Sequence, residues 1–175
     1  MNKTTWVVAN FLTYVFLVLL AVALQTSVFP WLFGWRANIQ VAVVLLTYIC
    51  LYREPLEGGV FAVLTGYFLG LMSTMMLSIS VFSCLCVFLA LRTLKTRVYM
   101  PGHVYFTWTT LGAIFGFHFF SWLATFFFES QALHFGILNW ILEILLTALF
   151  TRGLFHFCVW IDKRTKRLTL TELNS

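Results

Sequence analysis

The chain has 175 residues, of which 61% are hydrophobic and only 10% are charged, and its mean hydropathy is +0.92. Soluble domains carry about 25% charged residues, so this composition excludes a soluble globular protein and predicts an integral membrane protein. The net charge of +5 does not indicate nucleic-acid binding, because the basic residues stand at the ends of apolar runs rather than along one polar face.

Apolar runs fill most of the chain, and several approach the roughly 20 residues that cross a bilayer as a helix. The first covers residues 6–29 and ends at Pro30. A cleaved signal peptide is the rival interpretation, but this run is longer than the roughly 7–15 apolar residues of such peptides. The second run, over residues 37–52, is short. Trp35 and Tyr52 at its ends are typical of the aromatic residues at membrane interfaces.

Residues 58–91 contain no charged side chain. As one straight helix they would be about 51 Å long, well beyond a hydrocarbon core of about 30 Å. Serine and threonine residues gather in the middle, so we predict a turn there, between a third span at 58–75 and a fourth at 79–91. The rest of the chain holds a fifth span, a sixth span and a basic tail, at 104–128, 135–161 and 162–175.

Charge placement predicts that both termini of a six-span chain lie in the cytoplasm. An excess of lysine and arginine marks the cytoplasmic side of membrane proteins. The outer loops would hold only Arg36, and Arg152 would lie inside a span. The cytoplasmic segments would hold the other nine basic residues: Lys3, Arg53, Arg92, Lys95, Arg97, Lys163, Arg164, Lys166 and Arg167. The predicted fold class is therefore an all-α integral membrane protein with six transmembrane helices.

Small side chains recur at every fourth position of the third span, and a second small pair occurs in the fifth. A face of this kind lets two transmembrane helices approach closely. It predicts either packing within the chain, where the two sets could face each other, or an interface with a partner helix. The residues are Gly58, Ala62, Gly66 and Gly70 in the third span, and Gly112 and Gly116 in the fifth.

Glu143 and Arg152 are ionisable residues expected deep inside the sixth span, where such groups are costly and are candidates for function. They are nine residues apart, about 13.5 Å along one helix, so they cannot pair directly. We expect each to contact another helix, a water-filled cavity or the membrane interface. A structural polar contact, a partner-binding role and translocation of an ion or substrate are the open alternatives.

Catalytic and cofactor-binding patterns are missing from the sequence. It contains no Gly-x-Ser-x-Gly elbow, Walker loop or His-Glu-x-x-His motif, and no two histidines lie three or four residues apart. All four cysteines lie in apolar runs, as expected of buried small hydrophobic residues. We therefore predict no catalytic residue, cofactor or metal, and a membrane-embedded enzyme is the least favoured class.

The order of several short motifs resembles the rod shape-determining protein MreD family of bacteria. The motifs are Leu24-Gln25-Thr26, Ala37-Asn38-Ile39, the run from Tyr48 to Gly58, the run from Gly66 to Leu71 and the run from Arg92 to Arg97. The length, the six-span layout and the basic C-terminus are also similar. The likeness covers roughly the first hundred residues. It departs from the family at Ser73, where an aspartate is common, and at Ile79-Ser80, where the family has Leu-Gly.

This resemblance implies a non-catalytic scaffold of the inner membrane, with a fold similar to the substrate-binding subunits of energy-coupling-factor transporters. It implies an MreC-like partner and, through it, an MreB-like filament and the RodA polymerase with its transpeptidase during side-wall peptidoglycan synthesis. The similar fold keeps a second possibility open, a transporter subunit that binds a small molecule, because short spans interrupted by glycine and serine are typical of such sites. The basic tail is expected to attract anionic lipids of the bilayer.

Overall fold

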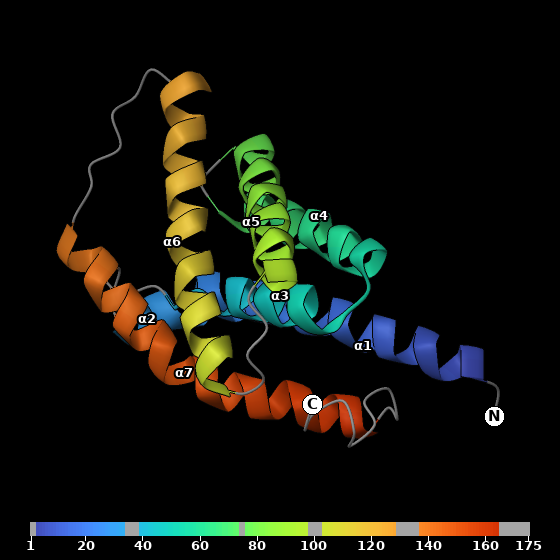
Figure 1. The fold of residues 1–175 in the computed structure, drawn as a ribbon. Helices are drawn as coiled ribbons and strands as arrows, with labels where there is room; N and C mark the ends of the chain where they lie inside the picture. The colour runs from blue at the N-terminus through green and yellow to red at the C-terminus, as the bar shows by residue number, and fades with distance from the viewer. Residues whose placement is uncertain (1–2, 34–38, 74–75, 98–102, 129–136, 165–175) are drawn as a thin grey trace.

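The computed structural model describes residues 3–33, 39–73, 76–97, 103–128 and 137–164. Within these ranges the regular structure is entirely helical, which confirms the predicted all-α class. The elements are α1 (Lys3–Ala23), the π-helical turn η1 (Leu24–Val28), α2 (Phe29–Phe33), α3 (Val41–Tyr52), α4 (Pro55–Met72), α5 (Leu77–Arg97), α6 (His103–Phe128) and α7 (Ile137–Arg164). Figure 1 shows how they are arranged.

The described residues include five helices that are long and apolar enough to cross a membrane. They are Val8–Trp31, Pro55–Met72, Leu77–Lys95, Val104–Phe127 and Glu143–Arg164. The outer surface of the bundle is itself apolar, since Leu149 is 76% exposed and Phe127 is 71% exposed. Such a surface is unfavourable in water and suits contact with lipid. The chain is therefore a multi-pass membrane protein.

The shortest of the apolar helices, α3, forms the centre of the bundle. Every residue from Val41 to Leu51 is buried, and α3 contacts α1, α4, α5, α6 and α7 (Figure 1). Its 12 residues extend about 18 Å, which is less than a hydrocarbon core of about 30 Å. A helix that is apolar on all sides is stable when other helices surround it. The predicted second span at 37–52 thus contains a shorter helix, and residues 34–38 lie outside the described ranges.

Most of the uncharged segment 58–91 lies in two helices, α4 and α5, which pack side by side (Figure 1). Pro55 occupies the start of α4, a position where its missing N–H breaks no helical hydrogen bond. The helix ends at Ser73, whose backbone is extended, with φ −105° and ψ 159°. The first helix therefore ends, as predicted, where serine and threonine gather, and α5 begins at Leu77; residues 74–75 lie outside the described ranges.

The helices at the two ends of the chain run past the predicted span limits. The backbone stays helical from α1 through η1 into α2, so the predicted span 6–29 lies within one longer rod. At the other end, α7 continues to Arg164, beyond the predicted limit at Ile161. The first three positions of the predicted tail are therefore helical. The reason is Asp162, which is buried against other helices; residues 165–175 lie outside the described ranges.

Candidate functional site

Asp162 on α7 is the centre of a buried cluster of polar side chains. Its Oδ1 accepts hydrogen bonds from Arg53 Nη2 at 2.5 Å and from Asn10 Nδ2 at 3.3 Å, and its Oδ2 accepts one from the Tyr48 hydroxyl at 2.7 Å. The Arg53 guanidinium carbon also lies 4.6 Å from the centre of the Tyr14 ring. These five residues, which we call the Asp162 cluster, join α1, α3 and α7.

Arg53 reaches this cluster because α3 ends at Tyr52. The Arg53 backbone is extended, with φ −112° and ψ 167°, and its N–H donates to the Ile49 carbonyl. Glu54 is extended as well, as expected of a residue that precedes proline. Sequence analysis places Arg53 in a cytoplasmic turn, but its side chain is buried, with 8% of the residue exposed.

The Asp162 cluster links α1, α3 and α7 through hydrogen bonds to one buried carboxylate. Asp162 is 1% exposed, and an ion buried to this extent is strongly unfavourable without a partner. Its carboxylate accepts three hydrogen bonds from the protein, one of them from a buried guanidinium. A buried carboxylate bonded in this way makes the packing of the three helices more rigid and specific.

A second polar cluster caps the start of α3. Gln25, in the π-helical turn η1, accepts a hydrogen bond from the Ala42 N–H at 3.2 Å and donates one to Gln40 Oε1 at 2.7 Å. The Gln40 N–H donates to the Thr147 hydroxyl of α7 at 3.3 Å. The first N–H groups of a helix have no partner within it, so these side chains satisfy donors that would otherwise be buried alone.

The small residues of α4 lie against α5. A Cβ atom added at Gly66 would lie 2.6 Å from the Val81 Cα, and one added at Gly70 would lie 2.7 Å from the Leu77 Cα. Contacts this short with backbone atoms leave room for no larger side chain. Ala62, one turn before Gly66, is fully buried. The Gly66–Gly70 face is therefore used for packing within the chain.

The other predicted packing glycines have more room. A Cβ at Gly58 would meet the Phe88 ring at 2.8 Å, but that ring is the end of a side chain that can move. The nearest atom at Gly116 belongs to Val87 and lies at 3.8 Å, and at Gly112 no atom lies within 4 Å. The idea that the glycine pairs of α4 and α6 face each other is therefore wrong, because α5 covers the α4 pair.

Glu143 is paired with a histidine on the neighbouring helix. Its Oε1 lies 3.0 Å from Nε2 of His118 on α6, and the residue is 7% exposed. On the same helix as His118, the Ser121 hydroxyl donates to the Ser83 hydroxyl of α5 at 2.9 Å. Glu143 therefore contributes to contacts between helices.

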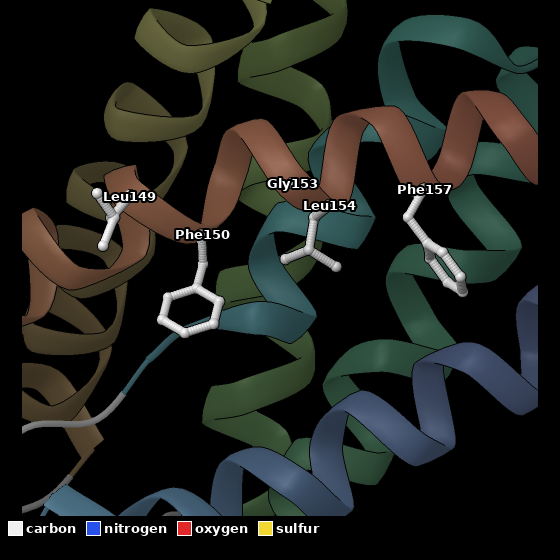
Figure 2. Close-up of a pocket in the computed structure, with 5 residues that line it drawn as sticks. All are labelled: Leu149, Phe150, Gly153, Leu154 and Phe157. Atoms are coloured by element: carbon white, nitrogen blue, oxygen red, sulfur yellow. The ribbon is translucent and has the colours of Figure 1, made fainter.

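Arg152 lies on the outer side of α7, away from Glu143. Nine residues on a helix amount to two and a half turns, which places the two side chains on opposite faces. Arg152 is exposed, and within the described part of the chain it forms no hydrogen bond or ion pair. A different side of α7 carries an open apolar groove of about 340 Å³ (Figure 2). The groove is lined by Leu149, Phe150, Gly153, Leu154 and Phe157.

The Asp162 cluster was not predicted from the sequence. Asp162 was assigned to the polar tail, Asn10 was not singled out, and Tyr48 and Arg53 were named only for other reasons. A signal was present, because Asn10 is a strongly polar side chain inside the first apolar run and Asp162 directly follows the last one. Polar groups at such positions are rare without an internal partner. The spacing of these residues in the sequence does not show which of them contact one another.

Metal ligands do not gather anywhere within the described ranges. No group of three or more His, Cys, Asp or Glu residues there could hold a metal ion, and the four cysteines are free thiols. Protein-family models, curated proteins and solved structures, when compared with the chain, give no match. Function is therefore inferred from the residues and their geometry alone.

Proposed function

We propose that the chain is a non-catalytic scaffold of the bacterial cell-elongation complex, embedded in the inner membrane by six spans with both termini in the cytoplasm. One observation carries this proposal: the motifs that resemble the MreD family supply the contacts that hold the helices together. Gln25 caps the start of α3. Tyr48 and Arg53 bind Asp162. Gly66 and Gly70 allow α5 to pack closely against α4. Contacts of this kind set the shape of a scaffold.

The basic end of the α4–α5 hairpin supports the same proposal. Arg92 Nη1 donates to the Arg53 carbonyl at 3.4 Å, and the Lys95 ammonium donates to the Leu51 carbonyl. These carbonyls lie at the C-terminal end of α3, where the last acceptors of a helix lack partners within it. The Arg92–Arg97 motif thus fastens α5 to the central helix.

Polar groups at both ends of α3 support counting this short helix as one of the six spans that we propose. Within a membrane, every backbone N–H and C=O needs a partner inside the protein. Gln25 provides one at the start of α3, and Arg92 and Lys95 provide others at its end. Five full-length helices around one short, capped helix are consistent with the six-span topology that we propose.

A transporter subunit that binds a small molecule is less well supported. A site of that type needs a few polar groups that converge on a cavity. Glu143 is paired with His118, Gln25 is engaged at the start of α3, and Arg152 lies on the outer face. The groove on α7 is lined by apolar side chains. A saturable ligand found in a thermal-shift screen of vitamins would reverse this ranking.

Depletion of the protein in a rod-shaped bacterium that carries the gene tests the proposal. We expect the cells to widen and become round, and the tagged chain to co-purify with an MreC-like protein in mild detergent. Gly66→Leu, which clashes with the α5 backbone, should fail to restore the shape. Gly112→Leu, a matched control with open space around it, should restore it. Normal rods after depletion, with no such partner in the purified sample, would reject the proposal.

A further inference from the structure

The outer face of α7 carries two ionisable side chains within an apolar surface. Arg152 and His156 are both exposed and lie four residues apart, so they are neighbours on the helix. Within the described part of the chain, neither forms a hydrogen bond or an ion pair. Leu145, Leu149 and Trp160 continue the same exposed face. Steps of three or four residues along this face are the spacing at which one helix packs against another.

The position of Arg152 along α7 limits which groups can neutralise its charge. It lies 15 residues after the start of α7 at Ile137 and 12 residues before its end at Arg164. These separations correspond to about 22 Å and about 18 Å along the helix, whereas half of a hydrocarbon core is about 15 Å. Arg152 therefore lies near the middle of the candidate span Glu143–Arg164. In a helix that crosses the bilayer, a charge at that position is strongly unfavourable unless it is paired. Lipid phosphates lie at the interfaces, too far away to be ready partners.

The surface of α7 at Gly153, the residue after Arg152, has room for a helix. A Cβ atom added at Gly153 would meet no atom within 4 Å, and the adjoining groove has a volume of about 340 Å³. Figure 2 shows Phe150, Leu154 and Phe157 pointing to the same side of α7. A helix that crosses α7 at Gly153 can approach closely there, as small residues permit in membranes. Its apolar side chains would then fill the groove.

We propose that this face of α7 docks a transmembrane helix of another protein, and that the helix carries an aspartate or glutamate opposite Arg152. The carboxylate would accept charge-assisted hydrogen bonds from the guanidinium. The ion pair would neutralise the positive charge of Arg152 within the lipid. A second copy of this chain is a poor occupant, because a two-fold contact at Gly153 would bring Arg152 against Arg152. Glu143 cannot serve either, since it is buried against His118. The inference rests on the proposed function only in taking the partner to be a membrane protein.

Photo-crosslinking in living cells tests the docking face. A benzoylphenylalanine replaces Leu149 on α7 or, as a matched control, Phe126 on α6, which is 70% exposed. We expect a protein adduct at position 149 and none at position 126. Mass spectrometry should place the adduct in an apolar span that contains Asp or Glu. Arg152→Gln should lower the adduct yield about threefold or more, as expected for the loss of one polar contact between helices. Arg152→Lys should retain most of it.

The remaining outcomes overturn the inference. They are adducts with lipid only, adducts with a second copy of this chain, a crosslinked span without an acidic residue, and a yield unchanged by Arg152→Gln. Arg152→Gln should fold normally, because Arg152 makes no hydrogen bond or ion pair within the described residues. Equal unfolding temperatures of the variant and the wild-type protein in detergent check this. Cell shape after depletion is measured separately, so the scaffold proposal and the docking face can fail independently.

Discussion

Replacing Asp162 by asparagine should destabilise the protein more than any other single change at its polar contacts. The carboxylate is 1% exposed and lies 2.5 Å from a guanidinium that is itself buried. Breaking a buried ion pair by removing one partner costs about 3–5 kcal/mol, because the other charge stays buried. Arg53 keeps its contact with the Tyr14 ring and lies 4.0 Å from Glu57, so we expect the lower end, about 3 kcal/mol.

The free energy of unfolding can be measured by titration of SDS into mixed micelles. The matched control is Glu57→Gln. It removes a carboxylate that lies 4.0 Å from Arg53, and the Glu57 side chain is 22% exposed. It should cost less than about 1 kcal/mol, because the two groups are 4.0 Å apart and the Glu57 side chain keeps contact with solvent. The double variant Arg53→Met, Asp162→Leu should be more stable than Asp162→Asn, because it buries no unpaired charge. Equal losses for Asp162→Asn and Glu57→Gln would refute this reasoning.

Three further variants probe the other contacts. Gly66→Ala should lower the free energy of unfolding by about 1–3 kcal/mol, because the alanine Cβ would press on the α5 backbone. Gly112→Ala, measured in the same titration, should change the free energy of unfolding by less than about 0.5 kcal/mol. Gln25→Leu should cost about 1–3 kcal/mol by leaving the N–H at the start of α3 unpaired, and faster amide exchange there would show the cause. Glu143→Leu should lower the thermal midpoint more than Glu143→Gln, which still offers an oxygen to His118; equal midpoints would contradict a structural pair.

Several parts of the fold followed from properties that a short stretch of sequence contains. The turn near Ser73 could be placed because an uncharged segment of that length is too long to be a single span. The close approach at Gly66 and Gly70 followed from their spacing on one helix face. Glu143 was expected to need a contact outside its own helix because a buried carboxylate is costly. His118 could not be named as that partner, since residue spacing does not show which helix faces Glu143.

Hydropathy and the spacing of small residues act over one or two helical turns, so the residue order was enough to establish a helical membrane protein and to predict where most of its spans lie. Asp162 and Arg53 are separated by 109 positions. Their pairing depends on how α7 lies across the end of α3, which is set by the packing of all the helices at once. For the same reason, the burial of short α3 at the centre and the exposure of Arg152 on the outer face became visible only in the folded chain.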